Sequence, residues 1–262
     1  MTDNAKESKT TKGLPKQSLY EGTRLQEFGT AAPQLLVLPD DLPEQDDYLQ
    51  KATDACSGKP MLSFMASCLS ADSLQNHLAP YLVARTADGI EWPIRWGDTR
   101  VLPGLIDALD VKLRTHLLSP LYAWWSIDRR GRFVARAGTA DPTPPPAGFD
   151  ALPISDAIFA RLVDQGEADA ILASIHDIQP DVLKQRAPAE CHALVGKHML
   201  IADQHGISAA GARQHFCTLS LVLADDFTRH PAMAILLQRT LQGGDYAKEI
   251  RALPESFWQE AG

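Results

Sequence analysis

The chain of 262 residues has no apolar run long enough to cross a bilayer. Its longest apolar runs, such as residues 219–224, fall far short of the ~20 residues that a membrane-spanning helix needs. Residues 1–16 are polar and carry lysines, and they lack the apolar stretch of a signal peptide. These absences predict a soluble, cytoplasmic protein without a membrane partner.

Cysteine is scarce, and its four copies form no close pair along the chain. Such spacing is typical of a reduced cytosolic protein with buried thiols, and it argues against a disulfide framework. An excess of basic residues is also missing, because the formal net charge is −8. The acidic balance disfavours nucleic acid as the main partner.

Signature motifs of catalysis are absent as well. The chain has no G-x-S-x-G elbow, no P-loop and no G-x-G-x-x-G after a strand. Cys191 and His192 are adjacent, and neighbours on a helix do not face one another. Cys217 falls in an apolar helical pattern and is expected to be a core thiol. We therefore expect no enzyme, and the alternative is a small cytosolic hydrolase whose nucleophile and base meet only in the folded chain.

Metal-ligand spacing is also lacking, although histidines crowd one region at positions 192, 198, 205 and 215. Ligands on one helix face need spacings of three or four residues, and these histidines are six or more apart. The acidic residues between 40 and 54 lack the ordered spacing and the glycine of a calcium loop. No metal and no other cofactor is expected.

What the chain does contain is clearest between residues 80 and 137. Residues 81–86 and 90–96 are rich in β-branched and aromatic residues and flank an Ala-Asp-Gly turn, which predicts a hairpin. Alternation in the second run places four apolar side chains on one face: Ile90, Trp92, Ile94 and Trp96. Pro93 cannot donate a ladder hydrogen bond, so this strand is expected at a sheet edge or with a bulge. Residues 121–127 and 132–136 predict a second hairpin.

A charged set lies between the two hairpins, at Arg95, Asp98 and Arg100. Asp98 or Thr99 is expected to cap a helix that begins near Pro103, and Asp98 can pair with one or both arginines. This structural brace is the favoured interpretation. The alternative is that one guanidinium remains free to bind a partner's carboxylate or carbonyl oxygen.

Two adjacent tryptophans in the second hairpin point to opposite faces of their strand, because strand side chains alternate. One core cannot bury both Trp124 and Trp125. Either helices cover both faces of the sheet, or one indole lies in a groove that is open to a partner. The sequence leaves both possibilities open.

The domain organisation follows from composition. Residues 1–17 have little to bury and are expected to be a disordered tail. Residues 18–137 predict a lobe with an antiparallel or mixed sheet and helices, to which residues 61–68 add an alternating strand. Four prolines and two glycines make 138–150 a linker. Residues 151–262 show only helical patterns, so the fold class is α+β with a C-terminal helical lobe.

An ordered set of segments resembles a known family. Residues 95–100, Arg-Trp-Gly-Asp-Thr-Arg, stand where the family has Arg-aromatic-x-Asp-Pro-Arg between a strand and a helix, and Ser119-Pro120 stands where a Gly-Pro precedes its Trp-bearing strand. Residues 18–23 and 32–39 are similar to the family's early segments. The chain thus resembles, from about Leu19 onward, the effector chaperone or adaptor domain of bacterial type VI secretion, long catalogued only as a domain of unknown function. Thr99 replaces the usual proline, and the family's preceding strand and helix are missing.

The resemblance implies a non-enzymatic chaperone that binds the amino-terminal region of a secreted toxin effector. It also implies that the chaperone shields apolar segments of this client and passes it to the spike protein of the secretion apparatus. Such work needs apolar and hydrogen-bonding complementarity and no cofactor. The candidate partner-binding residues are Trp92, Arg95, Trp96, Arg100, Trp124 and Trp125, and Asp98 is the structural brace.

Overall fold

The computed structural model describes residues 16–261, which form two compact units that divide between Asp164 and Gln165. The first unit combines small sheets with helices, and the second is helical. The division falls inside helix α5 (Asp156–Ile178), whose first turns belong to the first unit and whose later turns belong to the second. Each unit has its own hydrophobic core and is described by itself.

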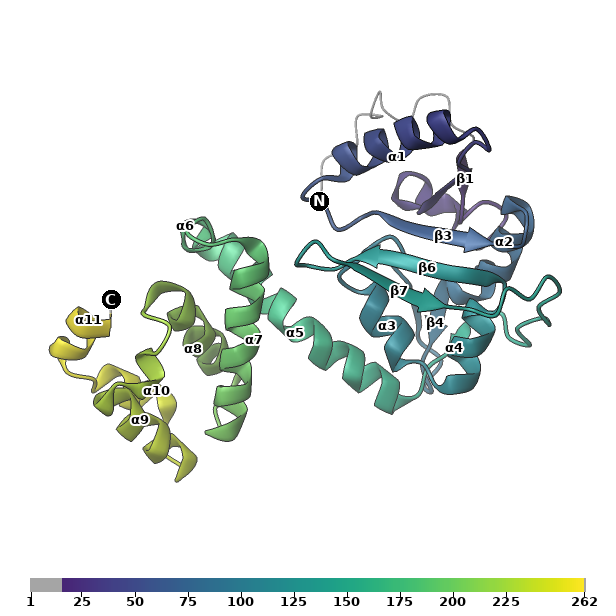
Figure 1. The fold of residues 1–262 in the computed structure, drawn as a ribbon. Coiled ribbons are helices and arrows are strands. Elements are labelled where there is room, and N and C mark those ends of the chain that lie inside the picture. Colours follow the sequence, from purple (N-terminus) through teal and green to yellow (C-terminus); the bar gives the residue numbers. More distant parts are fainter. Residues whose placement is uncertain (1–15, 262) are drawn as a thin grey trace. The chain divides into compact units, whose positions relative to one another are not determined.

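The strands of the first unit are short. They are β1 (Lys16–Ser18), β2 (Gln34–Leu36), β3 (Ser63–Ser67), β4 (Val83–Arg85), β5 (Glu91–Pro93), β6 (Leu121–Ile127), β7 (Phe133–Ala137) and β8 (Leu152–Pro153). β1 and β2 form a two-stranded ribbon, β3-β6-β7 is an antiparallel sheet, and β5-β4-β8 is a mixed sheet. Figure 1 shows β3, β6 and β7 side by side in this order.

The helices of the first unit are η2 (Gln26–Ala31), α1 (Leu42–Cys56), α2 (Ala71–Leu78), η3 (Ala79–Tyr81), α3 (Leu102–Ala108) and α4 (Val111–Leu118). Ser70 Oγ accepts the Ser73 N–H at the start of α2, and Ser155 Oγ accepts the Ile158 N–H at the start of α5. Both caps satisfy a backbone donor that the first helical turn leaves unpaired.

The core of the first unit lies between the two three-stranded sheets and the helices. Trp96 and Trp124 are 3% exposed, and their ring centroids are 5.5 Å apart. Leu102 and Ile106 of α3 and Leu121 of β6 belong to the same buried cluster. Leu152 of β8 joins the cluster after the proline-rich segment, which brings the chain back to pair with β4.

The proline-rich segment is hydrogen-bonded to the first unit at several points. We call residues 141–149 the proline strap. Just before it, the N–H groups of Gly138 and Ala140 donate to the carbonyls of Tyr122 and Leu121. A Cβ on Gly138 would meet two backbone carbonyl oxygens at 2.0 and 2.3 Å, so this close approach requires glycine.

The second unit is built from the later turns of α5 and from shorter helices. These are α6 (Pro180–Leu183), α7 (Pro188–Gln204), α8 (Ala210–Val222), η4 (Phe227–Arg229), α9 (Pro231–Leu241), α10 (Tyr246–Arg251) and α11 (Glu255–Ala261). Gly206, with φ of +70°, ends α7, and the Ile207 N–H then donates to the Ala202 carbonyl. Arg213, 9% exposed, ties α8 to Glu167 of α5 and Asp203 of α7.

The structure confirms the predicted α+β class, with sheets and helices in the N-terminal region and helices in the C-terminal region. The predicted tail lies outside the described residues except for Lys16 and Gln17, which belong to β1. The expectation of no strand after the second hairpin was wrong, since β8 follows the strap. None of the helices within residues 16–261 is long and apolar enough to cross a membrane.

The observed division of the chain differs from the predicted one. The sequence placed a linker at 138–150, because prolines cannot continue a sheet. In the structure this segment belongs to the first unit, since the carbonyl groups of Ser119 and of β6 and the β8 pairing hold it there.

Candidate partner-binding surface

The two adjacent tryptophans of β6 have different surroundings, as alternation predicts. Trp124 points into the core of the first unit, and its Nε1–H donates to Ser63 Oγ at 3.1 Å. Trp125 is half-buried and takes no part in that core. Trp124 is therefore a structural residue, whereas the Trp125 indole is accessible on the opposite face of the sheet.

The face that carries Trp125 is lined with apolar side chains. Strand register pairs Trp125 with Phe64 of β3 and Ala135 of β7, and it pairs Ile127 with Phe133. Directly paired residues share a face of an antiparallel sheet. Phe133 is 66% exposed, and the centroid of its ring is 6.1 Å from that of Phe64. We call these five residues the outer face.

The outer face differs from an ordinary solvated sheet face. Antiparallel sheets with one face in water normally place polar residues there. Here the half-buried or exposed side chains are three aromatic rings, one isoleucine and one alanine. Helix α1, which the chain forms just before β3, has no fully buried side chain. An apolar face of this kind is typical of a surface that binds a partner.

The tryptophans of the first hairpin are also separated by the fold. Trp96 is buried, and its Nε1–H donates to the Tyr81 carbonyl at 2.7 Å. Trp92 is 46% exposed at β5, which lies at a sheet edge as Pro93 predicted. Its ring lies 5.9 Å from that of Phe159 in α5. Trp96 is thus unavailable to a partner in this structure, while Trp92 is accessible on one side.

Asp98 binds Arg100 and leaves Arg95 apart. Its carboxylate accepts the Arg100 backbone N–H at 3.0 Å and the side-chain Nε and Nη2 at 2.9 and 2.7 Å. Burial alone raises the pKa of Asp98, but the hydrogen bonds from Arg100 outweigh it and hold that pKa below its usual value. Arg95 is exposed and contributes to Asp98 only through its charge.

The helix cap predicted at Asp98 or Thr99 was wrong. Helix α3 begins at Leu102, and its N-cap position is Val101 without a side-chain cap. Asp98 instead closes the turn before the helix, and its backbone carbonyl accepts the Val101 and Leu102 N–H groups. The brace at Asp98 is therefore a turn closed by an ion pair with Arg100, three residues before the N-cap position of the helix.

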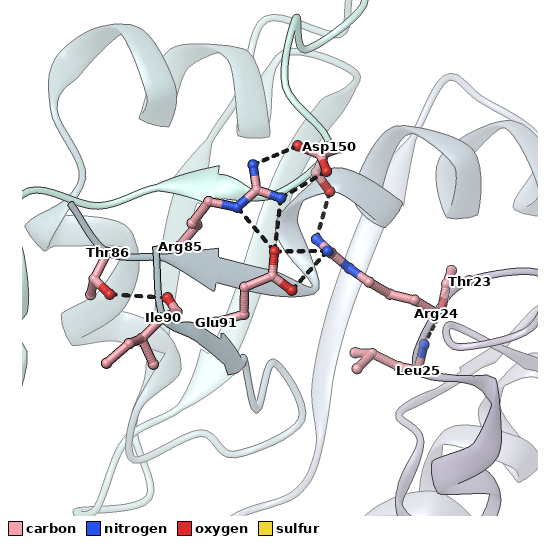
Figure 2. A network of polar contacts seen from close by, with 8 residues as sticks. All are labelled: Thr23, Arg24, Leu25, Arg85, Thr86, Ile90, Glu91 and Asp150. Atoms are coloured by element: carbon pink, nitrogen blue, oxygen red, sulfur yellow. Dashed lines mark hydrogen bonds and ion pairs between the residues drawn. The ribbon is translucent and has the colours of Figure 1, made fainter. Parts of the chain in front are cut away.

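A network of four charged side chains joins distant parts of the first unit (Figure 2). Glu91 of β5 accepts from Arg24 Nη1 at 2.8 Å on each oxygen and from Arg85 Nη2 of β4 at 2.7 Å. Arg85 also donates to both oxygens of Asp150, at 2.9 and 2.8 Å. Asp150 directly follows the proline strap, so the network fixes the end of the strap to the β4-β5 hairpin.

The network is balanced, with two positive and two negative charges. Hydrogen bonds from Arg85 lower the pKa of Asp150 to about 2 and hold the pKa of Glu91 below its usual value. Sequence reasoning missed the network because Arg24 and Asp150 are far from the hairpin along the chain. One signal was present: Arg85 and Glu91 are opposite charges directly paired across the predicted hairpin.

Of the residues considered for catalysis or metal binding, Cys191 and Cys217 belong to one buried apolar cluster. Burial raises the pKa of the Cys191 thiol and raises that of Cys217 to about 12, which is the opposite of an activated nucleophile. His198 is fully buried between Phe216 and Phe227. In the described part of the chain, no three His, Cys, Asp or Glu side chains are arranged to hold a metal ion.

Comparison with known families bears on the first unit. Residues 3–116 match the family model described as Domain of unknown function (DUF4123). The matched region ends within α4 and includes the Trp92 strand and the Asp98 turn, while β6, β7 and the second unit follow it. No curated protein and no solved structure matches the chain.

Proposed function

We propose that the chain is a non-enzymatic adaptor and chaperone of the bacterial cytoplasm. It binds the amino-terminal region of a type VI secretion toxin effector, stabilises this client and helps to load it onto the spike protein. The match to the domain of unknown function over residues 3–116 supports the proposal, together with the ordered segments that resemble the adaptor domain.

The observation that carries the proposal is the outer face. A chaperone of this kind needs a solvent-accessible apolar surface that can mask apolar segments of its client and release them later. Aromatic side chains at such a surface supply large contact areas at low entropic cost. Trp125 lies at the centre of the outer face, paired with Phe64 on one side and Ala135 on the other.

Charged residues of the β6-β7 turn lie beside the outer face and can make polar contacts with a partner at its rim. The β6-β7 turn is closed by Asp128, whose carboxylate accepts the Arg130 and Arg132 backbone N–H groups at 2.8 and 2.9 Å. The Arg130 side chain is exposed at this turn. In the proposed complex the apolar centre contributes most of the affinity, and rim charges such as Arg130 act mainly on the association rate.

The proposal is tested by measuring how tightly tryptophan variants of the full chain bind the client and how much client they keep soluble. Trp125→Ala is expected to weaken client affinity by about 2 kcal/mol or more and to reduce the amount of soluble client on co-expression. Trp92→Ala is the matched variant, because it removes a partly exposed indole from the other three-stranded sheet. It is expected to change client affinity far less.

Two results would count against the proposal. If Trp125→Ala captures the client as well as the unaltered chain does, the outer face is not the docking surface. If Trp92→Ala alone abolishes capture, the β5 edge takes that role. In both cases circular dichroism and the melting temperature of each variant must first show that the fold is intact.

A further inference from the structure

The proline strap is fixed at both ends and in its middle. At its start the Asp141 N–H donates to the Ser119 carbonyl at 2.8 Å. In its middle His116 Nε2 donates to the Pro145 carbonyl at 2.7 Å. At its end Phe149 packs edge-on against Tyr81, with ring centroids 5.3 Å apart. The strap is thus ordered before any partner binds, which lowers the entropic cost of binding.

Exposure along the strap repeats every third residue. Asp141, Pro144 and Ala147 are half-buried, and the two residues after each of the first two are exposed. A polyproline II helix has three residues per turn, so one of its edges faces the protein and two face solvent. The strap therefore displays a ridge of proline rings with no hydrogen-bonded neighbour strand among the described residues.

A cleft of about 630 Å³ lies between the strap and helix α2. One wall consists of the strap from Pro142 to Phe149 without Thr143, and the other consists of Leu69, Pro80 and the α2 residues Ser73, Asn76 and His77. The volume is within the range of pockets that take a peptide side chain or a small ligand.

The lining of the cleft selects against charged ligands. It contains no Asp, Glu, Lys or Arg side chain. His77 stays neutral near pH 7, because burial lowers its pKa. Its Nε2–H is already donated to the Leu117 carbonyl. The remaining polar groups are the exposed side chains of Ser73 and Asn76 at the mouth of the cleft. A flat, mostly apolar side chain with one polar edge fits such a lining.

We propose that this cleft is a second binding site, which takes an aromatic side chain, tryptophan above all, from an uncharged peptide segment of a partner protein. The faces of the indole pack against the proline rings of the strap and against Phe149. The indole N–H or the neighbouring peptide backbone binds Ser73 or Asn76. The site is distinct from the outer face and does not depend on the client proposed above.

The test is a titration of the isotope-labelled full chain with a blocked Ser-Gly-Trp-Gly-Ser peptide, followed by NMR. Backbone amide signals of Ser73, Asn76, His77 and Gly148 are expected to shift in a saturable manner. A peptide with leucine in place of tryptophan is expected to bind about tenfold more weakly, because it lacks the flat ring and the indole N–H. A peptide with glutamate at that position is expected to leave these signals unchanged.

A blocked variant supplies the control. Asn76→Trp places an indole at the mouth of the cleft and is expected to lower the affinity for the tryptophan peptide at least about tenfold. Val111→Trp adds the same side chain at a position of α4 that is 69% exposed and outside the cleft, and it is expected to bind normally. If Asn76→Trp lowers the melting temperature, Ser73→Trp blocks the same mouth.

The proposal is overturned if millimolar tryptophan peptide leaves these four signals in place. It is also overturned if the leucine peptide binds equally well or if both blocked variants retain full affinity. None of these results bears on the outer face, because the experiment uses the chain without a client.

Discussion

Tyr81 and His116 form a hydrogen-bonded pair whose removal has a calculable cost. Tyr81 is fully buried, and burial raises its pKa, so its hydroxyl stays protonated. His116 Nε2 faces the Pro145 carbonyl and must carry a hydrogen, which leaves Nδ1 as the acceptor for the Tyr81 O–H. The pair thus links the core to the proline strap through the His116 ring.

His116→Phe is the first perturbation. The phenyl ring keeps the stacking against His77, whose centroid is 5.2 Å from that of His116. It removes the acceptor for the Tyr81 O–H, and a buried donor without a partner costs about 1–3 kcal/mol. The Pro145 carbonyl is lost as a partner at smaller cost, because Pro145 is exposed to water.

Tyr81→Phe supplies the other corner of a double-mutant cycle. It removes the hydroxyl and costs about 1 kcal/mol, the net contribution of one hydrogen bond. In the double variant no buried O–H remains unpaired. We therefore expect the double variant to be less destabilised than the sum of the single variants, by about 1–2 kcal/mol.

The free energy of unfolding of the full chain in urea gives the coupling energy. Chymotrypsin provides a second measurement, because Phe149 lies half-buried at the end of the strap. Cleavage after Phe149 is expected to be faster in His116→Phe, which has lost the bond to Pro145, than in Tyr81→Phe. Additivity of the two substitutions within about 0.5 kcal/mol would refute the hydrogen bond and the tautomer assignment.

Three further predictions concern the stability of the chain. Gly138→Ala is expected to cost about 3 kcal/mol in urea unfolding, because its Cβ would meet carbonyl oxygens at 2.0 and 2.3 Å; an unchanged midpoint would contradict the close approach. Asp98→Ala is expected to cost about 2 kcal/mol through the lost bonds to Arg100. Unchanged stability with lost client binding would assign Asp98 to binding instead. Unfolding free energy is expected to fall as pH drops below about 6.5, because the unfolded state then binds protons at three histidines whose pKa values desolvation lowers in the folded chain: His77, His198 and His215. A flat profile between pH 8 and 5 would contradict this.

Local patterns in the sequence were sufficient to predict most of the individual helices and strands. Alternation in residues 61–68 predicted β3, and the two runs 121–127 and 132–136 predicted the β6-β7 hairpin. Capping hydrogen bonds such as those of Ser70 and Asp245 are local in the same sense, because they reach only two or three residues along the chain. Opposite directions for Trp124 and Trp125 followed from strand geometry alone.

Long-range pairing is what the sequence did not reveal. The two predicted hairpins lie in different sheets, because β6 pairs with β3 whereas β4 pairs with β8. Both pairings join segments more than 50 residues apart, and side-chain periodicity carries no information about them. The proline strap was predicted as a linker for the same reason, since its partners His116 and Ser119 are distant along the chain.

The candidate site was predictable in part. The sequence indicated that one core cannot bury both Trp124 and Trp125, and the structure shows that Trp125 is the one outside the core. The other members of the outer face, such as Phe64 and Phe133, were not singled out, because an aromatic residue in a strand is most often part of a core. Only the sheet register shows that these rings share a face with Trp125.

Site-specific photo-cross-linking tests most directly whether the outer face binds the client. A photoreactive phenylalanine analogue replaces Phe133, which is 66% exposed on this face, and in a second variant it replaces Val111 of α4, which is 69% exposed. Irradiation of the complex with the effector's amino-terminal region is expected to give a covalent adduct from position 133 and little or none from position 111. Equal yields at both positions, or no adduct at position 133, would contradict the account.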